Sequence, residues 1–253
     1  MFGKTKIYGK AQLLGTTGDN IFSVILLIFT FVLCLALPLG AYILLEMYGN
    51  ISPKYIENII VGLVFFITFS FLFLPTVFGF CNRLFTGARD NDFSKNAWLV
   101  WYRPALALKS FAYYLLIFVL KFLWFIALNV PAVAVASSTV YTIIKYGLSE
   151  KIFLVLMVLS IALLVVGSFF AFVISQRYFM TPYIIMADNS ITITEAVRKS
   201  TYLMNNICFK TAMFKLSFTG WFLSCIILAP VFYVLPYYKI SCINFAKECT
   251  QVS

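Results

Sequence analysis

Long apolar stretches separated by short polar segments run along most of this chain. A helix crosses a bilayer core with about 20 mostly apolar residues, and several stretches here reach or exceed that length. The pattern predicts an all-α polytopic membrane protein, a single integral membrane domain over residues 1–253 with about six transmembrane helices. The predicted spans are residues 21–45, 59–81, 111–129, 152–175, 209–228 and 230–247.

The third apolar stretch is too long for a single crossing. A helix from Phe111 to Ile144 would extend about 51 Å, whereas the hydrocarbon core is about 30 Å thick. Proline lacks an amide hydrogen and its ring clashes with the preceding turn, so Pro131 predicts a break in this helix. The span is therefore expected to end near Asn129, and a non-spanning segment rich in small residues follows it.

The last apolar region, Cys208 to Phe245, is also too long for one helix across one bilayer. Pro230 offers a break that would give a tight hairpin of two spans, and Pro236 interrupts the second of them. The alternative is five spans followed by a terminal surface helix.

Two segments between the spans are predicted to lie along the membrane surface. The first covers residues 93–110 and holds tryptophan and tyrosine side chains of the kind that sit at headgroup level. The second covers residues 192–207, where Thr192 and Glu195 have the spacing of a helix-capping box. Its apolar residues recur at helical spacing and predict an amphipathic interfacial helix. They are Ile193, Ala196, Val197, Leu203, Met204 and Ile207.

The overall composition identifies the bilayer as the solvent. Hydrophobic residues make up 62% of the chain and charged residues 11%, whereas soluble domains carry roughly 25% charged residues. So few charges cannot cover a water-facing surface, which excludes a soluble single domain. The chain contains no histidine, which removes histidine-based acid–base catalysis and histidine-ligated metals. The six cysteines form no CxxC pair and are expected to be reduced, buried side chains.

The excess of basic residues predicts an orientation. Lys and Arg number 19 and Asp and Glu 9, a net charge of +10. Under the six-helix prediction, 15 of the cations lie on the side of the N-terminus and 3 in the opposite loops, with Lys121 left inside a span. Both termini are therefore predicted to be cytoplasmic, in a multi-pass protein of the cell membrane. Cations that face anionic headgroups account for the charge without nucleic-acid binding.

Three lysines are candidate functional residues. Lys121 is an ionisable group inside a predicted span, which is costly unless its long side chain snorkels to the surface. Lys210 and Lys215 lie five residues apart at the beginning of the fifth predicted span. They could clamp a headgroup phosphate or simply anchor the helix at the interface.

The other three candidates are an aspartate and two prolines. Asp188 lies just ahead of the amphipathic helix, where it could bind a headgroup amine or form a turn that leads into the helix. Pro131 and Pro236 mark predicted interruptions of helices, and interrupted helices frame substrate sites in transporters.

A series of short motifs in the second half of the chain resembles a known family. The motifs are Leu123-Trp124, Asn129-Val130-Pro131, Arg177-Tyr178, Pro182 to Asn189, Glu195-Ala196, Ser200, Leu203-Met204, Leu216-Ser217-Phe218, Gly220-Trp221 and Pro236-Tyr237. In this order they resemble an uncharacterised bacterial integral-membrane family, domain of unknown function 975, over roughly residues 75–245. That family is in turn distantly similar to the membrane domain attached to some glycerophosphodiester phosphodiesterases. The resemblance implies a membrane architecture and no reaction.

No arrangement of residues in the sequence points to catalysis. The carboxylates form no recognisable pair and the phosphate-binding pattern GxxxxGK[ST] is absent, so no catalytic residue, metal or cofactor is predicted and the chain is expected not to be an enzyme. The favoured function is a non-enzymatic membrane protein that organises membrane lipids or protein partners, a homo-oligomer included. The alternatives are a transporter or permease component for a small solute or lipid, and a membrane stress or immunity protein.

Overall fold

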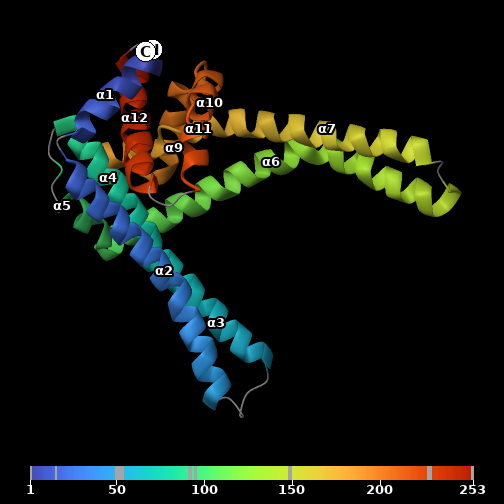
Figure 1. Cartoon of the computed structure of the whole chain (residues 1–253), viewed down its shortest axis with the longest axis horizontal. Coiled ribbons are helices and arrows are strands. Elements are labelled where there is room, and N and C mark those ends of the chain that lie inside the picture. The colour runs from blue at the N-terminus through green and yellow to red at the C-terminus, as the bar shows by residue number, and fades with distance from the viewer. Residues whose placement is uncertain are drawn as a thin grey trace. The chain divides into compact units, whose positions relative to one another are not determined.

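The structure, a computed structural model, describes residues 2–14, 16–48, 54–90, 93, 96–147, 150–226 and 230–251. All regular structure in these residues is helical and no strand occurs among them, which confirms the all-α class (Figure 1). The elements in chain order are α1 (Phe2–Leu14), α2 (Thr17–Tyr48), α3 (Lys54–Thr68), η1 (Phe69–Phe73), α4 (Leu74–Asp90), α5 (Asn96–Leu99), η2 (Val100–Tyr102), α6 (Pro104–Tyr146), α7 (Glu150–Ser175), η3 (Gln176–Tyr178), α8 (Thr181–Ala187), α9 (Ile193–Leu203), α10 (Cys208–Leu216), α11 (Thr219–Ser224) and α12 (Val231–Gln251).

The chain divides into two compact units, each assembled from separate segments. The first unit comprises Met1–Tyr114, Pro182–Ile193 and Ser217–Ser253, and the second comprises Leu115–Thr181 and Thr194–Leu216. Because the chain passes between the units several times, neither unit corresponds to one continuous stretch of sequence. The prediction of a single membrane domain stays a prediction.

The first unit is built around a helical hairpin of α2 and α3, which we call the first hairpin (Figure 1). From α3 the chain continues through η1, a π-helical turn, directly into α4. The C-terminal helix α12 packs against α1, α2 and α4. The unit buries large side chains, among them Val24, Phe78, Leu84, Ile240 and Ile243.

The second unit contains the hairpin of α6 and α7, which we call the second hairpin, and the short helices α9 and α10. Close approach of α6 and α7 depends on Gly167, because a Cβ atom there would lie 2.6 Å from the carbonyl oxygen of Leu128. Nearby, the Ser160 hydroxyl donates a hydrogen bond of 3.2 Å to the carbonyl of Ala132. Small residues of this kind let two helix backbones approach closely within a membrane.

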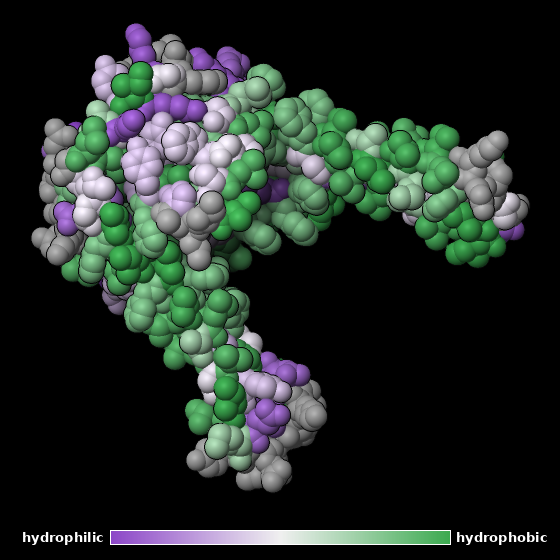
Figure 2. Space-filling view, viewed as in Figure 1, coloured by the Kyte–Doolittle hydropathy of each residue, from purple (hydrophilic) through white to green (hydrophobic). Residues whose placement is uncertain are grey.

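Four helical stretches of the described chain are long and apolar enough to cross a membrane. They are Thr17–Met47, Ile56–Asp90, Pro104–Lys145 and Ile152–Ala187. They contain the first four predicted spans, and Figure 2 shows hydrophobic surface along both hairpins. The predicted total of six spans is not confirmed.

The predicted break at Pro131 does not occur. Helix α6 continues through this proline as far as Tyr146. Proline removes one backbone hydrogen bond, but ending the helix inside a bilayer would leave several backbone groups without partners, at several kcal/mol each. The membrane environment therefore favours a continuous helix, and the prediction of a helix break at Pro131 was wrong.

The predicted fifth span over residues 209–228 is not one helix either. Helix α10 ends at Leu216, a turn follows at Ser217 and Phe218, and α11 ends at Ser224. Neither helix approaches the roughly 20 residues that a crossing needs. Residues 227–229 of the predicted hairpin lie outside the described residues. The predicted sixth span corresponds to α12, which begins directly after Pro230 and packs among the helices of the first unit.

The two predicted surface segments have different outcomes. In the segment 192–207, α9 begins at Ile193, and Ala196 and Met204 of the predicted apolar stripe are fully buried. In the segment 93–110, Trp98 and Trp101 are buried instead of lying at a headgroup surface. The ring of Trp101 packs 4.1 Å from that of Phe78, centroid to centroid, so these aromatic residues belong to the core of the first unit.

Candidate functional site

Each helix of the second hairpin contains a long uncharged interval that is bounded by a cation on either side. In α6, residues 122–144 carry no charge and lie between Lys121 and Lys145. In α7, residues 152–176 carry no charge and lie between Lys151 and Arg177. These intervals of 23 and 25 residues correspond to about 35 and 38 Å of helix, slightly more than a hydrocarbon core of about 30 Å.

A groove of about 300 Å³ opens between α6 and α7 beside Lys121. Its lining is Phe118, Lys121, Phe122, Phe125, Ser168, Ala171, Phe172 and Ser175. Lys121 and Ser175 line the same groove, and Ser175 is the last residue of α7. Lys121 therefore lies level with the end of the hairpin nearest η3, which we call its base, and the exposed side chain can reach the membrane surface.

Aromatic rings and cations surround the base of the second hairpin. The guanidinium of Arg177 lies 5.9 Å from the ring centre of Trp124, which is one helical turn beyond Lys121. The indole Nε1 of Trp124 donates a hydrogen bond of 3.1 Å to the hydroxyl of Tyr178. Amphipathic aromatic rings and cations together are typical of the headgroup layer of a membrane.

Helices α9 and α10 hold this base in place. The buried hydroxyl of Ser200 in α9 donates to the carbonyl of Arg177 at 2.7 Å and accepts the amide hydrogen of Met180 at 3.1 Å. In α10, the ammonium of Lys215 lies 4.6 Å from the ring centre of Phe179. Burial raises the pKa of the Cys208 thiol at the start of α10, so this thiol stays neutral. The base is thus a packed, basic and aromatic surface.

The chain matches one family model over nearly its whole length. Residues 5–253 match the family described as protein of unknown function (DUF975). The chain belongs to the DUF975 family. The match extends beyond residues 75–245, on which the resemblance in the sequence rested, and it includes both hairpins. No curated protein and no solved structure matches the chain.

The structure places only part of the predicted candidate set at this groove of the DUF975 chain. Lys121 lines the groove, Lys215 contacts the base through Phe179, and Lys210 lies exposed on α10. Pro131 lies ten residues along α6 from Lys121, which is nearly three helical turns away from the base.

Asp188 and Pro236 belong to the first unit. The carboxylate of Asp188 accepts hydrogen bonds from the amide and the hydroxyl of Ser190, at 2.8 and 2.6 Å. These bonds and the charge of Lys109 lower the pKa of Asp188. The geometry is that of a turn between α8 and α9, which is the structural alternative for this residue.

Sequence reasoning missed Trp124 and Arg177 as residues that organise the base of the second hairpin. It also missed Arg83 in α4, whose buried side chain donates to the backbone carbonyls of Asp19 and Phe93 at the end of the first hairpin away from its loop, which we call the base of that hairpin. Arg177 has a signal in the sequence, because it is the first charged residue after the apolar run of α7. Trp124 belongs to a motif of the family resemblance, but nothing in the sequence marks it as a residue that contacts Arg177 and Tyr178. Arg83 stands similarly after the apolar run of α3 and α4, but its contacts to distant residues are visible in the fold alone.

Proposed function

We propose that this protein is a non-enzymatic integral membrane protein that binds and organises anionic phospholipids at the base of its second hairpin. The observation that carries the proposal is the groove between α6 and α7, whose largely apolar lining includes the cation Lys121 at the level of the end of α7. An acyl chain would occupy the apolar part, and the phosphate of the headgroup would lie beside Lys121.

The distribution of charge supports an orientation for this lipid site. Each hairpin returns the chain to the side from which it started, and the loop ends carry three cations, Lys54, Lys145 and Lys151. The remaining 16 of the 19 Lys and Arg residues lie outside the two loop ends, Lys121 included. By the positive-inside rule the bases and both termini face the cytoplasm, where anionic lipids are attracted to basic residues.

The proposal is tested with Lys121→Leu and a matched control, Lys145→Leu, at the opposite end of the same helix. Each variant is reconstituted in nanodiscs of phosphatidylglycerol and phosphatidylcholine with identical acyl chains, and the lipids that stay bound after transfer to detergent are identified by mass spectrometry. A cation near a membrane surface contributes about 1 kcal/mol to the binding of anionic lipid. We therefore expect Lys121→Leu to lower the enrichment of phosphatidylglycerol about fivefold.

Lys145→Leu should leave the enrichment as it is in the parent protein, because Lys145 lies at the loop end of the hairpin, where its side chain contacts Tyr141. Equal losses in the two variants would contradict the proposal, since they would reflect charge alone. No enrichment in the parent protein would contradict it as well.

The alternative of a transporter component loses one of its supports. It rested in part on helices broken near Pro131, Pro230 and Pro236. Pro131 and Pro236 lie inside continuous helices, α6 and α12, whereas α12 begins directly after Pro230. Loss of solute flux in Lys121→Leu proteoliposomes, with lipid enrichment unchanged, would favour transport over lipid organisation.

A further inference from the structure

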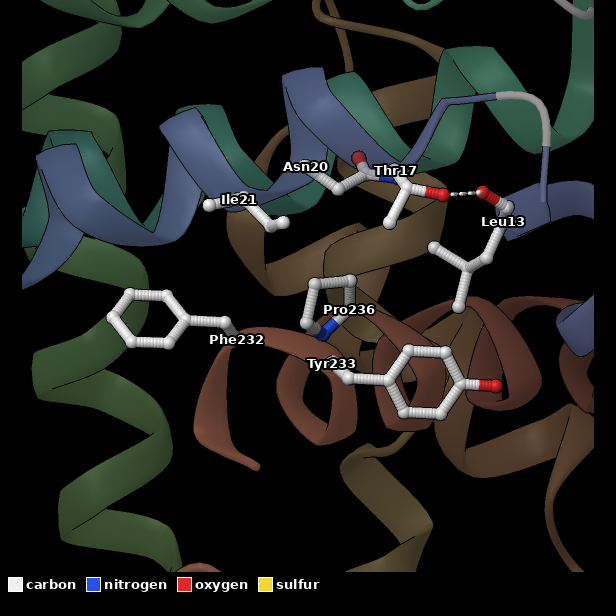
Figure 3. A pocket seen from close by; sticks show the side chains of 7 residues that line it. All are labelled: Leu13, Thr17, Asn20, Ile21, Phe232, Tyr233 and Pro236. Carbon is white, nitrogen blue, oxygen red and sulfur yellow. Dashed lines mark hydrogen bonds between the residues drawn. The ribbon is translucent and has the colours of Figure 1, made fainter. Parts of the chain in front are cut away.

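Four cavities in the part of the chain that the structure describes differ in whether a cation borders them. The cleft between the α1–α2 junction and α12 encloses about 180 Å³ (Figure 3). Its lining residues are uncharged, and the hydroxyl of Thr17 on its wall already donates to the carbonyl of Leu13 at 3.1 Å. Two grooves along α2 are also lined by uncharged residues. Among these four, the groove at Lys121 is the one that joins an apolar lining to a cation.

The second unit, to which this groove belongs, carries an excess of positive charge. Its sequence contains eight Lys and Arg residues and two Glu residues. Glu150 begins α7 at the loop end of the hairpin, and Glu195 belongs to α9, so α6, the rest of α7 and η3 contain no carboxylate. An anionic group at the base of the second hairpin therefore meets more cations than carboxylates. The cations of the unit are Lys121, Lys145, Lys151, Arg177, Arg198, Lys199, Lys210 and Lys215.

A second cation, Arg177, lies close to Lys121 at this base. Trp124 is one helical turn from Lys121 on α6, and residues at this spacing have Cβ atoms about 5–6 Å apart. The guanidinium of Arg177 lies 5.9 Å from the ring centre of Trp124. Arg177 also follows Ser175, which lines the groove together with Lys121, by two residues. Two independent contacts thus place both cations at the same end of the hairpin.

Both cations lie at the level where the hairpin leaves the hydrocarbon core. Lys121 bounds the uncharged interval 122–144 of α6, and Arg177 bounds the uncharged interval 152–176 at the end of α7. Cations at such a boundary meet the phosphates of the headgroup layer. Each arm of the hairpin therefore contributes one cation to the same layer.

Neighbouring side chains hold Arg177 in place and leave its charge uncompensated by them. The guanidinium is hydrogen-bonded to the thiol of Cys208 at the start of α10, and burial keeps this thiol neutral by raising its pKa. A guanidinium presents five N–H donors in a planar fork, so a bond to one sulfur atom does not use them all. The Arg177 side chain is only partly buried, and a phosphate at the surface can reach it.

Two phosphates on one molecule fit two neighbouring cations better than two separate lipids do. Once the first phosphate is bound, the second is held near its cation at a high effective concentration, so it binds without a further loss of translational freedom. Basic pockets between membrane helices on the cytoplasmic side bind headgroups of this kind. In cardiolipin, two phosphodiesters are joined through one glycerol.

We propose that the base of the second hairpin selects phospholipids with two phosphates, the cardiolipin class, over phospholipids with one. The inference rests on the proposed function, because Lys121 and its groove take the first phosphate and an acyl chain. It adds Arg177 as the residue that binds the second phosphate. The ligand is thereby narrowed from anionic phospholipids in general to one headgroup geometry.

The test compares lipids at equal numbers of phosphates and acyl chains. The full-length protein is reconstituted in phosphatidylcholine nanodiscs that hold two phosphatidylglycerol molecules for each cardiolipin, all with identical acyl chains. Retained lipids are counted by native mass spectrometry. One further cation near a membrane surface raises the binding of an anionic lipid about fivefold, so we expect about a fivefold preference for cardiolipin per phosphate.

Monolysocardiolipin separates the effect of the phosphates from that of the acyl chains, because it keeps both phosphates and lacks one chain. The parent protein should prefer it to phosphatidylglycerol as well. Retention of monolysocardiolipin no better than that of phosphatidylglycerol would overturn the inference. This measurement needs no variant, so it decides the question even where a substitution prevents folding.

Three variants locate the second phosphate. Arg177→Gln removes the charge and should lower the retention of cardiolipin to that of phosphatidylglycerol, whereas Arg177→Lys keeps the charge and should keep most of the preference. Lys199→Gln is the matched control, because Lys199 is an exposed cation on α9 of the same unit. It should prefer cardiolipin as the parent protein does. An unchanged preference in Arg177→Gln, or an equal loss in Lys199→Gln, would overturn the inference.

The same measurements separate this inference from the proposed function. Enrichment of phosphatidylglycerol over phosphatidylcholine with no advantage for cardiolipin would overturn this inference and leave the proposed function standing. No enrichment of either anionic lipid in the parent protein would overturn both.

Discussion

The two hairpins are alike in length and apolar character, yet their bases use polar residues in opposite ways. At the base of the first hairpin the charged side chain of Arg83 is buried, with 3% exposure. Its guanidinium donates to the backbone carbonyls of Asp19 and Phe93 and to the hydroxyl of Ser23. In the second hairpin Lys121 lies on the surface, level with the end of α7. The lesson is that apolar length predicts a crossing, whereas the burial of the flanking charge decides whether that charge holds the fold or meets the membrane.

The hairpins also differ in how much of their apolar surface the protein covers. In the first hairpin, 28% of the most apolar 18-residue stretch of α2 is buried, and the value for the continuous helix α3–α4 is 22%. In the second hairpin the corresponding values are 11% for α6 and 6% for α7. The second hairpin therefore relies on close contact between its own two helices, while the first is also held by α12 and by the polar contacts of Arg83.

The largest effect is expected from Arg83→Met. This variant removes a buried cation together with its hydrogen bonds to the backbone carbonyls of Asp19 and Phe93. A hydrogen bond from a charged donor is worth about 1.5–3 kcal/mol, so the loss of two of them should destabilise by roughly 3 kcal/mol, and we expect a clearly lower midpoint of thermal unfolding in detergent. Arg89→Met is the control on the same helix, because Arg89 pairs with Asp90 at the surface and should change stability by less than about 0.5 kcal/mol. Similar midpoints for the two variants would show that the inward charge does not hold the first hairpin.

An intermediate effect is expected from Gly167→Ala in the second hairpin. The added Cβ would lie 2.6 Å from the carbonyl oxygen of Leu128, and a backbone atom cannot move aside without separating the helices. Overpacking of this kind costs about 1–3 kcal/mol. Gly62→Ala in α3 is the control, because nothing lies within 4 Å of its Cβ position, and it should raise stability by about 0.5–1 kcal/mol. Thermal unfolding of both variants measures the difference, and equal changes would argue against a close contact at Gly167.

The apolar stretches and the stripe of α9 could be predicted from the sequence, because both follow directly from periodicity and length. Pro131 misled the prediction, since a rule derived from helices in water overstates the tendency of proline to end a helix in a bilayer. Trp98 and Trp101 misled it too, because an aromatic residue in a polar segment looks the same in sequence whether it faces headgroups or a core. Trp98 fits because Gly79 on α4 leaves room for its ring.

The candidate site was predictable in part. Lys121 stood out in the sequence as a charge within an apolar run. Whether it lies in the membrane interior or near the surface could be decided only from the neighbouring helix α7, whose last residue, Ser175, lines the same groove as Lys121. The hydrogen bond from Arg83 to the carbonyl of Asp19 had no signal in the sequence, because the two residues lie 64 positions apart along the chain.

The smallest effect is expected at Asp188, which tests whether the strength of a polar contact in the first unit depends on its burial. Asp188 is exposed, and the hydrogen bonds from Ser190 hold its pKa below the ordinary value near 3.9. A carboxyl group whose pKa is lowered in the folded state stabilises that state at pH values above its ordinary pKa. This stabilisation is lost as the pH falls through the lowered pKa. Asp188→Asn should therefore unfold at a slightly lower temperature than the parent at pH 7 and at the same temperature near pH 2. A difference at pH 7 as large as that of Arg83→Met would mean that burial does not govern these contacts.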